Sequence, residues 1–161
     1  MTGELRRLNM LKVRDVMAKG AICIAAGESM DQVAQALRER GISGLPVVNE
    51  DGRCIGIISA MDFVTRVTAG GAGAAGRSGG DTAESFMTRG AICVTPDSMM
   101  AEAARIMRDQ HVHRLPVIDE QTRLLGVITS TDVVAAVVNA MDEAHQSEEN
   151  VRSDQKRRAV S

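Results

Sequence analysis

The chain has 161 residues and a formal net charge of −2 at pH 7. Hydrophobic residues make up 44% of it, which suits a folded core, but Phe63 and Phe86 are its only Phe, Tyr or Trp residues. This composition argues against binding to nucleic acid or to an anionic membrane, which needs positive charge, and against single-strand binding, which needs aromatic stacking platforms.

The cellular location follows from what the sequence lacks. No apolar run approaches the roughly 20 residues that span a bilayer, and the first residues do not form a signal peptide. The cysteines Cys23, Cys54 and Cys93 are odd in number and have no Cys-x-x-Cys spacing. We therefore expect a cytoplasmic protein without a membrane partner, whose cysteines are small core residues.

The first half of the chain reads as an N-terminal segment followed by a short α/β unit. Residues 1–12 predict a short helix, and the unit at 13–68 opens with a helical turn and a strand at 21–25. A helix then begins after Ser29, where Gln32 completes a capping box, and Gly41 ends it. Strands at 45–48 and 54–58 follow, joined by a hairpin turn, with a last helix at 60–67.

The second half repeats the first. A shift of 70 residues aligns 13–64 with 83–134 without a gap, for example Leu45-Pro46-Val47 with Leu115-Pro116-Val117. We expect a second unit at 82–141. Because each copy is too short for an adequate core, the two should pack together around a pseudo-twofold axis.

Two segments lie outside the repeats. Residues 69–81 have the composition of a flexible linker, and although Gly71-x-Gly73-x-x-Gly76 matches the dinucleotide fingerprint, the strand and helix that the fingerprint needs are missing. Residues 142–161 are almost wholly polar. We expect this tail to fray or to stay disordered.

A junction that occurs once in each repeat carries the main functional signal. A buried strand ends at a hydroxyl residue, and an aspartate follows three positions later as a helix begins. The pairs are Ser59 with Asp62 and Thr129 with Asp132. As capping boxes they would satisfy the first N–H groups of the helix, as is also predicted at Ser29 and at Asp81.

The same junction also suits a nucleotide. The N–H groups and dipole at a helix N-terminus attract phosphate, the hydroxyl adds a donor, and a carboxylate accepts both hydroxyls of a ribose. Gly56 and Gly126 in the preceding strands leave room for a ligand or for another backbone. From the residues alone, the cap and the binding site both remain open.

The duplicated pattern resembles a tandem pair of cystathionine β-synthase (CBS) domains, often called a Bateman module. The resemblance rests on two Gly-hydrophobic-x-Ser/Thr-x-x-Asp motifs, each after a hydrophobic-Pro-Val strand, and on the opening Val13-Arg14-Asp15-Val16-Met17. It covers residues 13–141. It implies an α+β fold of two β-α-β-β-α units packed through their sheets, with two clefts that bind adenosine ligands in many relatives.

The resemblance also implies a role for particular residues. Asp62 and Asp132 would hold ribose, with Ser59 and Thr129 on the phosphate side. His113 and Arg114, just before the second Pro-Val strand, would reach phosphates. The adenine would lie against the first strand of each repeat and its flanks, at Ala21, Ile22, Cys23, Ala91, Ile92 and Cys93.

The two clefts are not expected to be equivalent. Ser43 and Gly44 stand where the second repeat has His113 and Arg114. If the family pattern holds, each cleft joins the aspartate of one repeat to the pre-proline residues of the other. The Asp62 cleft would then prefer phosphorylated ligands, whereas the other would bind weakly, take a less charged ligand or stay empty.

A metal site and an enzyme are weaker alternatives. His111 and His113 share a strand face, but two ligands without a third and fourth seldom hold a metal, so we expect none. The sequence has no P-loop, no Gly-x-Ser-x-Gly and no paired carboxylates beyond the caps. We therefore expect no catalytic residue and no cofactor.

Two functions remain. The first is a regulatory sensor that binds AMP, ADP, ATP or S-adenosylmethionine in the clefts between the repeats and signals to a separate effector protein or through a homodimer. The second is a degenerate pair of domains that acts as a structural, interaction or dimerisation module without a ligand, in which the two motifs are only helix caps.

Overall fold

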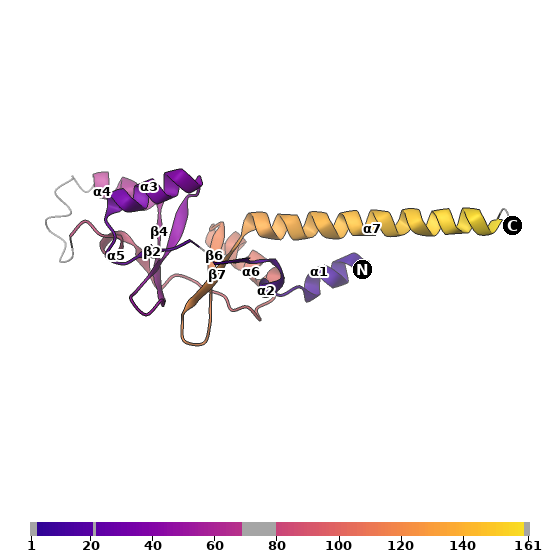
Figure 1. The fold of residues 1–161 in the computed structure, drawn as a ribbon, viewed down its shortest axis with the longest axis horizontal. Helices are drawn as coiled ribbons and strands as arrows, with labels where there is room; N and C mark the ends of the chain where they lie inside the picture. Colours follow the sequence, from indigo (N-terminus) through magenta and orange to yellow (C-terminus); the bar gives the residue numbers. More distant parts are fainter. Residues whose placement is uncertain (1–2, 21, 69–79, 160–161) are drawn as a thin grey trace. The chain divides into compact units, whose positions relative to one another are not determined.

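The structure is a computed structural model that describes residues 3–20, 22–68 and 80–159 (Figure 1). The first half contains α1 (Gly3–Met10), α2 (Val13–Val16), β1 (Ala18–Lys19), β2 (Ile24–Ala25), α3 (Met30–Arg40), β3 (Gly44–Val48), β4 (Cys54–Ser59) and α4 (Ala60–Thr68). The second half contains α5 (Ala83–Phe86), β5 (Thr88–Arg89), α6 (Met100–Gln110), β6 (Arg114–Ile118), β7 (Leu124–Thr129) and α7 (Ser130–Ala159). The predicted linker at 69–81 lies outside the described residues as far as residue 79, and its Gly71-x-Gly73-x-x-Gly76 motif lies wholly outside them.

The strands form two sheets, which confirms the predicted α+β class. One sheet has the strand order β2-β3-β4-β5 and the other has the order β1-β7-β6. In the first, β2 pairs parallel to β3, whereas β3, β4 and β5 pair antiparallel. The predicted strand at 21–25 is shorter in the structure, where β2 covers only Ile24–Ala25.

The chain divides into two compact units that do not coincide with the two sequence repeats. One unit combines residues 1–18, 94–115 and 127–161, and the other combines 19–93 and 116–126. The opening segment of each repeat therefore belongs to the unit built mainly from the other repeat. The boundaries predicted at 13–68 and 82–141 follow the repeats in the sequence, and as domain limits they stay a prediction.

Backbone hydrogen bonds hold each exchanged opening in place. The N–H of Ala83 donates to the carbonyl oxygen of Glu28 at 2.8 Å. The N–H of Val13 likewise donates to the carbonyl oxygen of Ser98 at 2.8 Å. The exchanged segments also fill cores, because Phe86 lies in one hydrophobic cluster with Ile24, Leu37 and other residues of the first repeat.

The caps of the long helix in the first repeat are those that the sequence predicts. The Ser29 hydroxyl accepts from the Gln32 N–H at 3.2 Å, and the Gln32 side chain accepts from the Ser29 N–H at 2.8 Å. Gly41 follows α3 in the left-handed region, with φ 61°. The cap predicted at Asp81 is wrong, because Thr82 precedes α5 and the Asp81 carboxylate instead pairs with the Arg66 guanidinium.

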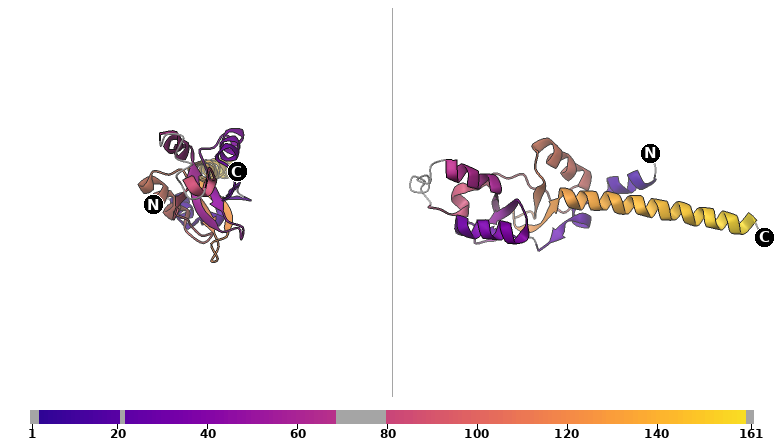
Figure 2. Two further views of the ribbon diagram at one scale, coloured as in Figure 1. Left: turned by 90° about the vertical axis from the view of Figure 1, so that its left-hand side faces the viewer. Right: turned by 90° about the horizontal axis from the view of Figure 1, so that it is seen from above.

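The C-terminal helix corrects the prediction of a frayed tail. α7 has 30 residues and, at about 1.5 Å per residue, is about 45 Å long. The tail lacks glycine and proline and is rich in Ala, Glu, Gln, Lys and Arg, which favour helix even where every face meets water. Figures 1 and 2 show one continuous helix whose C-terminal part stands clear of other elements in its unit. None of the described helices is long and apolar enough to cross a membrane.

Candidate ligand site

The junction of the first repeat lies where β4 passes into α4. The Asp62 carboxylate folds back over the start of the helix, and its Oδ2 accepts from the Ser59 N–H at 2.6 Å and from the Ser59 hydroxyl at 3.2 Å. Both side chains are half-buried. The half of the predicted capping box in which the aspartate accepts from the Ser59 N–H is therefore present.

The junction of the second repeat has the same design, with one more hydrogen bond. Oδ2 of Asp132 accepts from the Thr129 N–H at 2.7 Å and from the Thr129 hydroxyl at 2.9 Å. The Asp132 N–H donates to the Thr129 hydroxyl at 3.2 Å. Each repeat thus fixes a carboxylate at the N-terminus of a helix, where the helix dipole stabilises negative charge.

These caps leave the aspartates able to bind a further group. The described hydrogen bonds that the Asp62 and Asp132 carboxylates accept all reach Oδ2, so Oδ1 of each can accept from a ligand hydroxyl. A carboxylate held rigidly by its own helix is well placed to bind two neighbouring hydroxyls. A cap and a ribose site are therefore compatible uses of one side chain.

The residues before the prolines lie close to the aspartate of their own repeat. The Ser130 N–H donates to the His113 carbonyl oxygen at 2.9 Å, and the Ala60 N–H donates to the Ser43 carbonyl oxygen at 2.9 Å. Gly44 pairs with Ser59 in the ladder between β3 and β4. Each junction therefore contains a pre-proline segment, and only that of the second repeat carries basic side chains.

Arg114 is the most distinctive charged group at these junctions. Its Nε is buried without a hydrogen-bond partner among the described residues. Burial lowers the pKa of the Arg114 guanidinium, and the nearby Asp132 carboxylate opposes that shift. The sequence did not predict this proximity, which gives the Asp132 junction a positive charge of its own. The predicted combination of Asp62 with His113 and Arg114 stays a prediction.

The residues expected on the adenine side are partly accessible. Ile22 and Ile92 have 38% and 42% of their surfaces exposed, whereas Cys23, Ala91 and Cys93 are half-buried. Ala21 lies outside the described residues. Exposed isoleucines offer an apolar surface to a flat base, but their role in adenine binding stays a prediction.

A groove that the sequence analysis missed borders Asp132. It lies between α1 and the first half of α7, has a volume of about 350 Å³, and also includes Leu8, Leu11 and Asp15 in its lining. The apolar spacing of the N-terminal segment predicted a helix but not the surface that it covers. No local pattern in the sequence could reveal that Leu8 and Asp132, so far apart in the chain, share a cavity.

The part of the chain that the structure describes does not support the hypothesis of a metal site at His111 and His113. Within it, no three His, Cys, Asp or Glu side chains gather so as to hold a metal ion. His111 follows α6 in the left-handed region with φ 54° and is thus the helix C-cap. This position corrects the expectation that His111 lies on a strand face with His113.

Comparison with known proteins identifies the family. The sequence model of the CBS domain matches residues 13–69 and 83–139. A homoserine O-acetyltransferase of Methanococcoides burtonii is 33% identical over 126 residues, which cover 78% of this chain and 24% of that protein. The chain therefore spans about a quarter of that relative's length.

Solved structures with the same fold include two described with adenosine compounds. CBSX2 of Arabidopsis thaliana in complex with AMP has a TM-score of 0.71 and 25% identity, with 80% of this chain and 96% of that chain covered. The CBS domain pair of protein MJ0100, in complex with 5′-methylthioadenosine and S-adenosyl-L-methionine, has a TM-score of 0.66 and 27% identity, with 78% and 94% covered. The chain belongs to the CBS domain family and contains two copies of the domain in tandem.

Proposed function

We propose that this chain is a regulatory module that binds an adenosine ligand, such as AMP, ADP, ATP or S-adenosylmethionine, at its two strand-to-helix junctions. One observation carries the proposal: in each repeat the aspartate at the helix N-terminus is fixed through Oδ2 and keeps Oδ1 for a ligand. The adenosine compounds bound by CBSX2 and by the MJ0100 domain pair support the choice of ligand.

The charge at Arg114 favours a phosphorylated ligand. A buried guanidinium nitrogen without a partner costs free energy, which a phosphate or another anion can recover through a charge-assisted hydrogen bond. We assign Asp62 and Asp132 to ribose, Ser59, Thr129, His113 and Arg114 to the phosphate side, and the six flanking residues named above to adenine. Arg114, which lies near the Asp132 carboxylate, serves the Asp132 site.

Regulation, not catalysis, is the proposed role of the chain. A ligand that binds two arrangements of the protein with different affinity shifts their populations, and a separate effector protein can read that shift. The chain matches only 24% of the homoserine O-acetyltransferase. This share is consistent with a regulatory region attached to an enzyme.

The test is a thermal-unfolding series with AMP, ADP, ATP, S-adenosylmethionine and 5′-methylthioadenosine. A ligand at 100 times its dissociation constant should stabilise the fold by about 2.7 kcal/mol. Asp62→Ala and Asp132→Ala should each lose about 1 kcal/mol of stability as caps and should also lose ligand stabilisation at their own site. Ser29→Ala is the matched control, since it removes a cap away from both junctions.

The outcomes separate the two candidate functions. If none of the five compounds raises the unfolding temperature, the chain is not an adenosine sensor. In that case the aspartates are caps alone, and the degenerate structural module remains. If ligand stabilisation survives both aspartate substitutions, binding occurs elsewhere and the assignment of Asp62 and Asp132 is wrong.

We also propose that a second copy of the chain covers an apolar stripe on α7. Val134, Val138 and Met141 follow one another at spacings of four and three residues, and 60%, 48% and 54% of their surfaces are exposed. Light scattering should give the mass of a dimer, and Val138→Asp should convert it to a monomer. Val151→Asp is the matched control, because Val151 is 56% exposed on another face of the same helix. A wild-type monomer would contradict the dimer.

A further inference from the structure

The groove beside Asp132 has an unusual wall. Its far side is α1, which contributes Arg7, Leu8 and, just beyond the helix, Leu11. These residues precede the first match to the CBS domain, which begins at residue 13. The repeats themselves therefore do not supply this wall, and the chain adds it to the Asp132 junction.

The chemistry of the groove suits a nucleoside. Leucine and alanine side chains form its apolar surface, and Asp15 and Asn139 add polar groups near Asp132. The volume of about 350 Å³ is within the range of roughly 300–1,000 Å³ that is usual for small-molecule sites. An apolar wall next to a carboxylate is the arrangement needed to hold a flat base beside the hydroxyls of its ribose.

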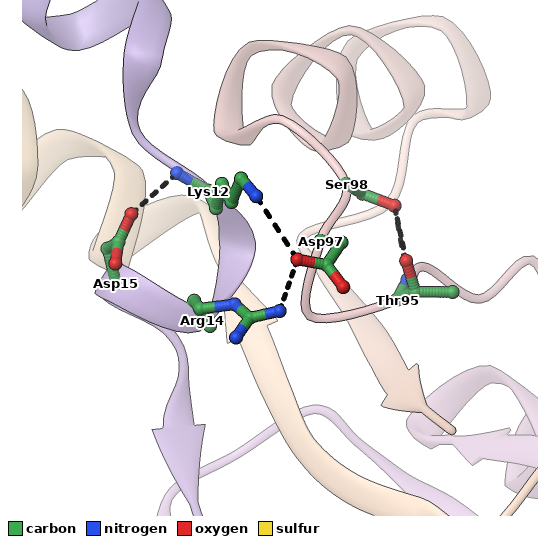
Figure 3. Close-up of polar contacts among 6 residues, drawn as sticks. All are labelled: Lys12, Arg14, Asp15, Thr95, Asp97 and Ser98. Atoms are coloured by element: carbon green, nitrogen blue, oxygen red, sulfur yellow. Dashed lines mark hydrogen bonds and ion pairs between the residues drawn. The ribbon is translucent and has the colours of Figure 1, made fainter. Parts of the chain in front are cut away.

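Backbone hydrogen bonds attach the base of the N-terminal segment to the start of α6 and the residues before it. The carbonyl oxygen of Leu11 accepts from the Met100 N–H at 2.9 Å. The side chains of Lys12 and Arg14 both point toward Asp97 (Figure 3). Oδ1 of Asp97 accepts from the Lys12 ammonium group at 3.2 Å and from the Arg14 guanidinium. The Asp15 carboxylate accepts from the Lys12 N–H at 2.8 Å. The chain is thus anchored immediately after α1.

The helix itself packs against α7 and α6. Its described polar contact with α7 is the ion pair of Arg7 and Glu143 at 3.4 Å, and 78% and 66% of these side chains are exposed. An ion pair so exposed contributes little to stability. An isolated helix of eight residues is marginal in water. A fixed base and a helix too short to be stable alone make α1 a wall that can move relative to the rest of the groove.

We propose that a nucleoside bound at Asp132 occupies this groove and holds α1 against α7, so that the N-terminal helix is a movable wall of the ligand site. The inference rests on ligand binding at Asp132, the function proposed above. It adds that Leu8 contacts the ligand. It also adds that ligand binding in the groove changes the position of α1, a helix outside the CBS repeats.

Hydrogen exchange of the full chain tests this inference. The amides of residues 3–10 should exchange about tenfold more slowly with saturating 5′-methylthioadenosine or AMP, because the bound ligand favours the closed helix. Leu8→Asp should weaken binding of the same compound about tenfold, since it places a charge on the apolar wall. Met10→Asp is the matched control: Met10 lies on the same helix, is 75% exposed and does not line the groove.

Three results are distinguishable. The inference is supported if residues 3–10 exchange more slowly with ligand and if Leu8→Asp, but not Met10→Asp, binds the ligand more weakly. Ligand stabilisation that depends on Asp132, with unchanged exchange in α1 and unchanged affinity in Leu8→Asp, overturns the movable wall but keeps the proposed function. No stabilisation by any of the five compounds of the thermal-unfolding series overturns both.

Discussion

Gly56 lies against the carbonyl oxygen of Thr88: a Cβ built on Gly56 would stand 2.6 Å from that oxygen. Gly56 is in β4 and Thr88 in β5, the strand that the second repeat contributes to the sheet of the first. Of the two uses predicted for this glycine, room for a ligand or for another backbone, the structure confirms the second.

Gly56→Ala should therefore destabilise the fold by about 3 kcal/mol, because a backbone carbonyl cannot move aside without breaking the pairing of β4 with β5. Urea unfolding measures the change. Gly27→Ala is the control, since a Cβ at Gly27 would meet nothing within 4 Å. Equal stability of the two variants would show that β5 does not pack on β4 in solution.

The residues that end the two long helices should respond in opposite ways to substitution. Gly41 and His111 are equivalent in the repeats and have φ of 61° and 54°. His111→Gly should raise the free energy of unfolding by about 0.5 kcal/mol, because only glycine adopts this conformation without steric cost. Gly41→Ala should lower it by about 1 kcal/mol. Losses of stability in both variants would contradict the assigned cap at His111.

Arg114→Gln should weaken phosphorylated ligands selectively. The loss of one buried charge-assisted hydrogen bond, about 1.5–3 kcal/mol, should lower the affinity for AMP tenfold or more while leaving 5′-methylthioadenosine nearly unaffected. Calorimetric titration measures both affinities. Arg108→Gln is the control, because Arg108 is exposed and already pairs with Asp109 at 2.7 Å. A similar loss for both ligands would exclude a phosphate contact at Arg114.

Cys54 should be the most reactive thiol at neutral pH. The neighbouring Cys93 thiol lowers the pKa of Cys54 to about 7, and the same interaction raises the pKa of Cys93. Burial and the Glu28 carboxylate raise the pKa of Cys23. The Cys54 thiolate fraction therefore rises as the pH rises through about 7, and alkylation by iodoacetamide should follow it.

The matched variant for this prediction is Cys93→Ala. Without the Cys93 thiol, the pKa of Cys54 should rise, and its alkylation profile should move to higher pH. Peptide mass spectrometry after timed labelling distinguishes the three cysteines. An unchanged profile in the variant would mean that Cys93 does not hold the Cys54 thiolate.

Features of this fold that depend on neighbouring residues were predictable from the sequence. Ser29, Gln32 and Gly41 set the limits of α3 by local hydrogen bonds and backbone conformation, which act within a few residues. The spacing of Ser59 and Asp62 likewise predicted their contact. These interactions need no knowledge of the distant chain.

Features that depend on distant residues were missed. Asp81 looked like a helix cap, but the Arg66 guanidinium binds its carboxylate from another element. The proximity of Arg114 to Asp132 and the wall that Leu8 gives to the groove are also tertiary relationships. The tail differs from its prediction for another reason: its polar residues have a high helix propensity, so it is helical although it is polar on every face.

The exchange of opening segments determines how the protein would behave if it were cut. Each half of the chain, separated near residue 75, would lack the segment that completes its core, as Phe86 completes the cluster of the first repeat. Two separate halves would have to associate in a bimolecular reaction whose yield depends on their concentration in solution. Within one chain a short tether provides an effective concentration on the order of millimolar. Cooperative folding of the two repeats thus depends on their covalent connection, whatever its sequence.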